Sequence, residues 1–487
     1  MKKKTPDEKP ADAAFKSRNP SRRSSSFVIL HSAFVISLAG CNLAPKYDPP
    51  AVALPSHFKT SGPWRQAKPG DHDSRGNWWR LFGDSRLTAL MQRAEANSPT
   101  LEVAMHKVDE ARALARADRA GLFPFVAWNS SVKRSHGSGT LANTFAGGVT
   151  TTRIKSTLDL EYELDFWGKL RNQSAAANSK AESAEADHRS VLLTLQGEIA
   201  LNYFALRSQD AEIALLKRAI ELREKAVDLA KARFKQGDTA QLDVAQAETE
   251  LATARSEAIG LEKLRAELDH AIALLVGTTP AELSHAPSPL SGTPPSVPTS
   301  LPSDLLERRP DIAAAERTMA EQNALIGVAR AAVFPSVKIG LSNGGETSYL
   351  KKLADAASHV WGLGPDVQWP VFDGGKRLAE TDAQRAKYLQ AAGSYRETVL
   401  KAVRDVEDAL SGISILNRQA AAQAQTVAGA QKTVELAEKR YSAGLVAYYE
   451  VLDAQRTLLR AEQELTRING EQFLSTVLLI KALGGGW

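Results

Sequence analysis

The sequence contains two copies of one structural unit. Residues 233–237 (RFKQG) match residues 440–444 (RYSAG), 207 positions later. The Phe-Pro pair at 123–124 returns at 334–335, an offset of 211 positions. A nearly constant offset over this length indicates an internal repeat. Whatever fold one half adopts, the other half is therefore expected to repeat.

Both halves show the same order of elements: a helix that ends at Phe-Pro, two strands, and a pair of long helices. Proline stops the first helix and pushes the residue before it towards an extended geometry. The first repeat is predicted over 81–277 and the second over 304–487. The expected strands and helix pairs are 122–135, 151–167 and 170–276 in the first repeat, and 333–342, 359–372 and 375–484 in the second.

A coiled-coil pattern marks the long helix predicted over 170–236. Its apolar residues recur at spacings of 3, 4 or 7 positions, which predicts a helix–helix seam. They are Leu192, Leu195, Ile199, Tyr203, Leu206, Ile213, Leu216, Ile220, Val227 and Phe234. At ~1.5 Å per residue this helix is roughly 100 Å long. Gly237 and its equivalent Gly444 are expected to end the long helices and let the chain reverse. Helices at 97–121 and 239–276 are expected to stack end to end beside the long one.

The segment 153–166 alternates between apolar and polar residues, which predicts a strand with two different faces. Four acids share the polar face: Asp159, Glu161, Glu163 and Asp165. A water-soluble sheet also alternates in this way, but acids opposite leucines and aromatics favour a wet lumen and a lipid exterior. A metal site is disfavoured, because same-face neighbours lie ~6–7 Å apart and no histidine accompanies them.

Four strands per chain are too few to close a membrane barrel, which needs about eight or more. Open sheet edges are not tolerated in lipid. A membrane-spanning role therefore requires several copies of the chain, and three copies would supply twelve strands.

The N-terminus has the features of an export signal. A basic segment precedes an apolar run at 27–40 that is too short to span a bilayer as a helix. The run ends Leu-Ala-Gly before Cys41, the only cysteine. This pattern predicts a signal peptide at 1–40 and attachment of lipid to Cys41; an ordinary signal peptide with an incidental cysteine is the alternative. Two proline-rich stretches, at 41–80 and 278–303, are expected to form an N-terminal arm and an extended linker.

The charge distribution argues against nucleic acid as a partner. The formal net charge of +5 lies entirely within residues 1–41, and the rest of the chain is formally neutral. No basic face for a phosphate backbone is therefore expected. Nor does the sequence carry a G-x-S-x-G, P-loop or G-x-G-x-x-G motif, and its nine histidines are scattered. No enzymatic activity, metal or cofactor is expected.

Three motifs in this order support a family resemblance: residues 78–84 (WWRLFGD), 307–312 (ERRPDI) and 448–456 (YYEVLDAQR). The chain resembles the outer-membrane factors of tripartite efflux pumps, in the NodT-type lipoprotein branch of the TolC-like family. The resemblance implies a mainly α homotrimer, with a 12-stranded outer-membrane β-barrel continued by a 12-helix periplasmic α-barrel. It also implies a periplasmic adaptor (membrane fusion) protein and an inner-membrane transporter of the resistance–nodulation–division (RND) class as partners.

The same resemblance implies a gate where the helix pairs turn. Tyr449 and Asp453 stand at i and i+4 on one helix face and match the family's constriction. The alternative is that Tyr449 is a packing residue and Asp453 a solvent-exposed charge on the helix. Tyr441 and Asp243 match positions that link neighbouring helices, although Asp243, the repeat equivalent of Glu450, is equally suited to a capping role. Where some relatives carry a basic residue, this chain has Val446, so the corresponding salt bridge is not expected.

Two other functions remain open at this point. The duct could serve a type I protein-secretion system. From another class, a lipid-anchored periplasmic coiled-coil scaffold would explain the helices and Cys41, but not the amphipathic strands. The exported substrate does not follow from the sequence.

Overall fold

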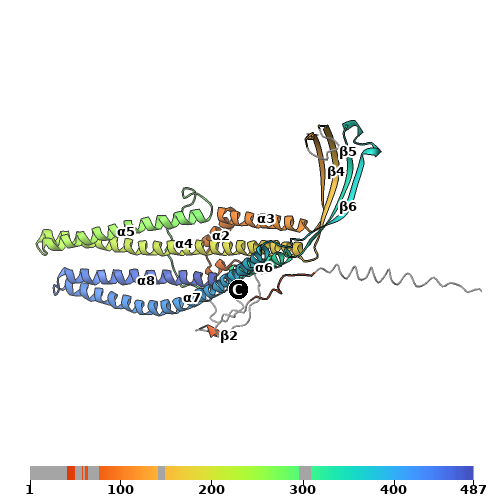
Figure 1. Ribbon diagram of the computed structural model, residues 1–487. Coiled ribbons are helices and arrows are strands. Elements are labelled where there is room, and N and C mark those ends of the chain that lie inside the picture. Colours follow the sequence, from red (N-terminus) through yellow and green to blue (C-terminus); the bar gives the residue numbers. More distant parts are fainter. Residues whose placement is uncertain are drawn as a thin grey trace, which may run out of the picture. The chain divides into compact units, whose positions relative to one another are not determined.

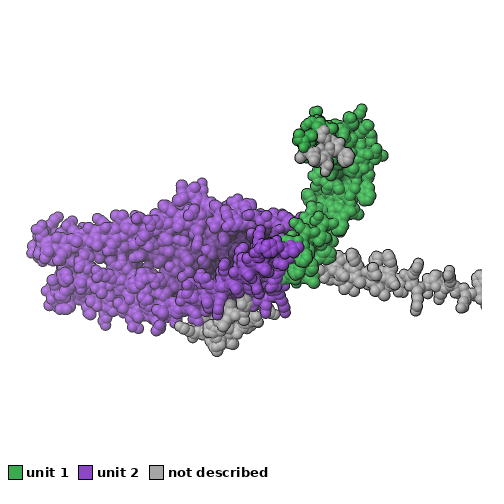
Figure 2. All heavy atoms as spheres, viewed as in Figure 1, with its two compact units in different colours: residues 1–43, 124–169, 334–370 green, residues 44–123, 170–333, 371–487 purple. Residues whose placement is uncertain are grey.

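The computed structural model describes residues 41–49, 57–58, 61–63, 76–140, 148–295 and 309–485. The predicted signal peptide, residues 296–303 of the predicted linker and the first five residues of the predicted second repeat, 304–308, lie outside these residues. The chain divides into two compact units, shown in green and purple in Figure 2. One contains the sheet, from segments 124–169 and 334–370, and the other contains the helices, from segments 44–123, 170–333 and 371–487.

The helical unit repeats one plan twice, with a short helix followed by a long antiparallel pair (Figure 1). The first repeat contains the 3-10 helix η1 (Trp78–Phe82), α2 (Ser85–Asn97), α3 (Pro99–Ala120), α4 (Lys169–Gln236) and α5 (Gln241–Leu275). The second contains α6 (Pro310–Ala331), α7 (Lys376–Ser442) and α8 (Tyr448–Ala482). Pro99 and Pro310 occupy the first helical position of α3 and α6, where proline is favoured because its missing N–H is not needed.

Helices α3 and α5, which together run beside α4, meet end to end. Gly277, just after α5, has φ +73°, and a Cβ built there would lie 2.1 Å from the backbone oxygen of Asn97, just before α3. Only glycine permits this approach. In the second repeat Arg309, just before α6, donates to the oxygen of Ala482 at the end of α8 (3.1 Å). Each repeat therefore joins its short helix to its returning helix at one junction.

An aromatic core packs around η1. Trp79 is 1% exposed and Trp78 4%, and Phe82 contacts Phe204 of α4 and Phe473 of α8 with ring centroids 4.7 and 6.3 Å apart. Burial of aromatic side chains of this size gives a large hydrophobic contribution. This core holds the two repeats together because its members come from both.

The described part of the linker, 278–295, has no helix or strand but is fixed to the helices. Asp210 of α4, 2% exposed at its side chain, accepts from Arg265 (2.6 Å) and from the amide of Ser288 (2.7 Å). Arg207 donates to the oxygen of Ser288 (2.5 Å). Leu290 packs against the aromatic core. The proline-rich segment has no regular structure here, and hydrogen bonds of Ser288 with Asp210 and Arg207 attach it to α4.

The sheet unit has four antiparallel strands in the order β3-β4-β5-β6. They are β3 (Phe125–His136), β4 (Thr150–Leu164), β5 (Ser336–Thr347) and β6 (His359–Gln368); a separate pair, β1 (His57–Phe58) and β2 (Ser61–Pro63), lies in the N-terminal arm. No helix among the described residues is long and apolar enough to cross a membrane.

Three strand ends differ from the sequence prediction. β5 runs to Thr347 and not to 342, because Gly344 belongs to the strand: a Cβ there would lie 2.1 Å from the oxygen of Ser156 on β4. Glycine here allows close backbone approach, although in sequence it suggests a loop. β4 ends at Leu164, so Asp165 lies beyond the strand, and β6 ends at Gln368 and not at 372.

Cross-strand register gives the sheet one apolar and one polar face. Leu158 pairs with Trp128 on β3, and Leu341 on β5 pairs with Leu363 on β6. The side chains on this face are exposed in the single chain; Trp128 is 74% and Leu363 66% exposed. An exposed apolar face of this extent requires a non-aqueous environment or a partner.

Candidate functional site

The two helix turns have the same backbone structure. After α4, Gly237 has φ +79°, and the amide of Asp238 donates to the oxygen of Arg233 (2.9 Å). After α7, Gly444 has φ +72°, and the amide of Leu445 donates to the oxygen of Arg440 (2.9 Å). Both are glycine-terminated helix ends of the Schellman type. The repeat therefore extends to the hydrogen bonds of the turns.

Tyr449 and Asp453 lie on one exposed face of α8, within its first two turns. Tyr449 is 54% exposed, and Asp453 and Glu450 are also exposed. The structure thus places the predicted constriction residues at the surface of a single chain, where their side chains are free to face other copies.

Tyr441 and Asp243 have separate partners within one chain. The guanidinium of Arg233 lies over the Tyr441 ring, 4.9 Å from its centroid. Asp243, in the first turn of α5, accepts a hydrogen bond from Thr239. Among the described residues, no hydrogen bond joins Tyr441 to Asp243 within the single chain.

Tyr448, which precedes the predicted gate residues, is buried where the two helix pairs meet. Its ring lies 5.4 Å from that of Tyr441 and packs with Val227 and Ala247 of the first pair. Its hydroxyl has no hydrogen-bond partner among the described residues. Burial, with smaller effects from Tyr441 and the acids nearby, raises the pKa of this hydroxyl above 10.

A buried ion cluster, which the sequence analysis did not predict, joins the two helix pairs close to their turns. Glu250 of α5, 9% exposed at its side chain, contacts Arg223 of α4 (3.2 Å) and accepts from Nε of Arg456 on α8 (2.9 Å). The hydrogen bond from Arg456 and the charges of both arginines lower the pKa of Glu250 below 4.5. The carboxylate therefore stays ionised at neutral pH and links three helices.

The ion cluster breaks the internal repeat. At the offset of 207, Arg223 corresponds to Ala430, Glu250 to Thr457 and Arg456 to Thr249. None of these equivalents carries a charge. A difference between copies at otherwise repeated positions was the sequence signal that could have identified the cluster.

The predicted lumen acids do not form an uncompensated row of negative charges. Asp159 accepts from Asn129 (2.6 Å), Glu161 contacts Lys338 (2.5 Å) and Glu163 contacts Lys169 (3.0 Å). Asp165 follows the strand. No group of side chains suited to holding a metal ion occurs among the described residues.

Cys41 is exposed and its thiol is free. The arm that follows it lies along α6. The oxygen of Pro45 accepts from Asn323 (2.9 Å) and the Tyr47 hydroxyl donates to the oxygen of Glu316 (3.1 Å). A Cβ built at Gly327 would lie 2.8 Å from that of Ala44, so glycine here leaves room for the arm.

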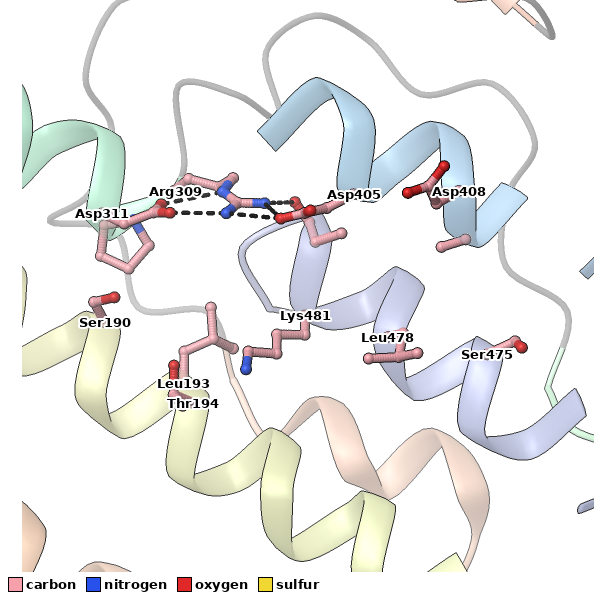
Figure 3. Close-up of a pocket in the computed structure, with 13 residues that line it drawn as sticks. Ser190, Leu193, Thr194, Arg309, Asp311, Asp405, Asp408, Ser475, Leu478 and Lys481 are labelled. Atoms are coloured by element: carbon pink, nitrogen blue, oxygen red, sulfur yellow. Dashed lines mark hydrogen bonds and ion pairs between the residues drawn. The ribbon is translucent and has the colours of Figure 1, made fainter. Parts of the chain in front are cut away.

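A cavity of about 450 Å³ lies between α4, α6, α7 and α8 (Figure 3). Arg309 crosses one side of it and pairs with Asp311 (2.7 Å) and Asp405 (3.5 Å). Lys481 extends from α8 towards Leu193 of α4. Arg309 is 12% exposed at its side chain, so Arg309 and Pro310 contribute a structural junction of helices.

Comparison with known sequences agrees with this architecture. The sequence profile of the family described as "Outer membrane efflux protein" matches residues 90–278 and 301–485, one segment in each repeat. "Cation efflux system protein CusC" of Escherichia coli (strain K12) is 31% identical over 453 residues, covering 93% of this chain and 97% of that protein. "Solvent efflux pump outer membrane protein SrpC" of Pseudomonas putida is 32% identical over 460 residues, covering 93% and 97%.

Solved structures show the same fold. The outer-membrane channel OprN superimposes with a TM-score of 0.83 at 28% identity, and CusC with 0.82 at 29% identity. Each alignment covers 92% of this chain and all of the other. The predicted fold class is confirmed for the chain, which is mostly helical with a four-stranded antiparallel sheet. Its function in efflux and its location in the outer membrane are likewise confirmed. The chain belongs to the outer membrane efflux protein family.

Proposed function

We propose that three copies of this chain form a passive exit duct, a closed twelve-stranded barrel continued by a tunnel of helices, and that the duct only conducts. The observation that carries this proposal is the sheet. It has four strands with one apolar and one polar face, and its outer strands, β3 and β6, each have one unpaired edge in the described residues. Closure with other copies pairs those edges and turns the polar faces inward.

One tryptophan in β6 and one just after it support this placement in the membrane. Trp361 in β6 and Trp369, one residue beyond its end, are eight residues apart, or ~27 Å along the strand at ~3.4 Å per residue. With a strand tilt of ~40° this corresponds to a height of ~21 Å. Membrane barrels carry aromatic girdles at both edges of an apolar band about 25 Å tall. The two tryptophans fit the two edges, with Leu363 and Val367 between them.

We infer that the helix turns form the gate. Tyr449 and Asp453 of three copies would give an aromatic ring and an acidic ring around the axis, which together restrict passage and attract cations. Tyr441 and Asp243 of adjacent copies would supply the contact between chains. Val446 offers no charge, so the closed state relies on these groups and on packing.

The ion cluster at Glu250 divides the gate into two kinds of seam. Within each chain the helix pairs are joined by Arg223, Glu250 and Arg456. The pseudo-equivalent seam between chains would have Ala430, Thr457 and Thr249 at these positions. Opening would therefore separate adjacent chains and leave each chain's own pairs together, because the seam between chains lacks this ion cluster at the equivalent positions.

Cys41 is proposed to carry the lipid that anchors the arm to the outer membrane. The proposed partners are a periplasmic adaptor and an inner-membrane RND transporter, which would meet the duct at the helix turns. The names of the relatives support a pump, since CusC belongs to a cation efflux system and SrpC to a solvent efflux pump. Because those names differ in substrate, the duct is proposed to be permissive and the transporter to select. Service to a type I secretion system is the alternative.

The test is assembly and conduction. Purified from outer-membrane fractions, the protein should migrate as a heat-modifiable trimer and form ion-conducting pores in planar bilayers. A monomer without conductance would support a periplasmic scaffold instead. Cross-linking from cysteines placed in the turns should capture an adaptor of a pump; capture of a protein-secretion adaptor would select the alternative.

A further inference from the structure

Lys338 occupies the centre of an acidic group on the polar face of the sheet. In the strand register it pairs with Glu163 on β4 and with Asp366 on β6. Its ammonium lies 2.5 Å from the carboxylate of Glu161, diagonally across β4. One cation therefore stands among three acids that come from both neighbouring strands.

The residues beside Lys338 leave it open to water. On the same face, Gly340 and Gly364 pair with each other and carry no side chain, and Ser342 pairs with Gly362. The side chain of Lys338 is 42% exposed and that of Glu161 54%. In a closed barrel this face surrounds the passage, so ions moving along it would pass close to these charges.

The acids of this group are mostly, but not fully, compensated by lysines. Glu161, Glu163 and Asp366 supply three negative charges, against Lys338 and Lys169, whose ammonium lies 3.0 Å from Glu163. We propose that Lys338 sets the charge selectivity of the membrane passage, by holding the net charge of this group at one negative charge per chain. The inference rests on the proposed trimeric duct, because only closure places the polar face around the conduction path.

The direction of the effect follows from electrostatics. Removal of Lys338 leaves three acids and one cation in each chain, and three chains place that change at one level of the passage. Rings of carboxylates favour cations, and the interaction is stronger at low salt because screening is weaker. Lys338 therefore limits cation preference, and the duct passes anions more readily than its acid row suggests.

The experiment is the reversal potential of the full-length trimer in planar bilayers under a potassium chloride gradient. Lys338→Gln should raise the potassium-to-chloride permeability ratio by about twofold or more at low salt. Lys338→Arg should leave the ratio near that of the unmodified protein. The double variant Glu161→Gln with Lys338→Gln restores the net charge and should restore the ratio.

A second variant separates selectivity from folding. Lys338→Cys places a reactive thiol on the lumen face, and charged methanethiosulfonate reagents can modify it after assembly. A positive reagent should lower the permeability ratio and a negative reagent should raise it. Conducting channels whose ratio does not respond to Lys338→Gln or to the reagents would overturn the assignment. Failure to conduct at all in the unmodified protein would instead contradict the proposed duct.

Discussion

Arg456 on α8 donates from both Nε and Nη2 to a single oxygen of Glu250 on α5, a residue 206 positions earlier in the chain. The pair lies one helical turn beyond Asp453, and Arg223 holds the second oxygen of the same carboxylate (3.2 Å). A contact between repeats thus lies next to the proposed constriction. Its position explains how the helix pairs of one chain would move as a unit.

Removal of this carboxylate should loosen the seam within the chain. Glu250→Gln leaves Arg223, 11% exposed at its side chain, without its counter-charge. The expected loss in free energy of unfolding is about 1–3 kcal/mol. This is less than for a fully buried pair, because Arg456 is more exposed. Thermal unfolding should show a lower melting temperature. Single-channel recordings should show additional openings, because the seam within the chain can then separate as well as the seam between chains. Thr457→Ala, at the equivalent position of the second repeat, is the matched control. Equal behaviour of the two variants would remove the cluster from the gate.

The same cluster predicts a pH dependence. The hydrogen bond from Arg456 and the charges of both arginines lower the pKa of Glu250 in the folded protein below its ordinary 4.5. Its contribution is therefore complete above about pH 4.5 and is lost as pH falls through the lower, folded-state value. Opening frequency should stay constant from neutral pH down to about 4.5 and increase below it, and Glu250→Gln should remove that increase. An increase that persists in the variant would assign it to another acid.

Tyr449 and Asp453 should control passage at the turns. The double variant Tyr449→Ala with Asp453→Ala should raise single-channel conductance by about twofold or more and reduce cation selectivity, because a bulky ring and a carboxylate ring are both removed. Asp408→Ala, an aspartate on α7 that is 74% exposed at its side chain, changes the same charge away from the turns. Conductance and selectivity unchanged from the unmodified protein would exclude these residues from the constriction.

Close approach of β4 and β5 should depend on Gly344. Gly344→Ala introduces a methyl group at 2.1 Å from the oxygen of Ser156, and the expected cost is about 1–3 kcal/mol from overpacking. Heat-modifiable trimer recovered from membranes should decrease. Gly362→Ala, on β6 with nothing within 4 Å of the new Cβ, should assemble normally. Equal recovery of both variants would show that the pairing tolerates the added carbon.

The order of helices and strands could be predicted from the spacing of apolar residues, because helices and strands have characteristic periods. The seam from Leu195 to Val227 and the alternation from Arg153 to Leu164 both follow from side-chain direction along a single element. Strand ends did not follow from local pattern. Gly344 favours a loop by propensity, yet it lies within β5, since the neighbouring strand needed space that only glycine leaves.

The repeat, the long helices, the two-faced strands and the family could be predicted from the sequence, because each depends on residues close together in the chain or on motifs at a fixed offset. The pairing of charged side chains could not be predicted, because it depends on how the elements pack in the folded chain. Glu250 joins Arg456, and Lys338 stands between Glu163 and Asp366, through helix rotation and strand register. Local periodicity encodes neither helix rotation nor strand register. The sequence therefore predicted a row of acids along β4 where the structure has acids paired with lysines, and it did not predict the ion cluster within the chain.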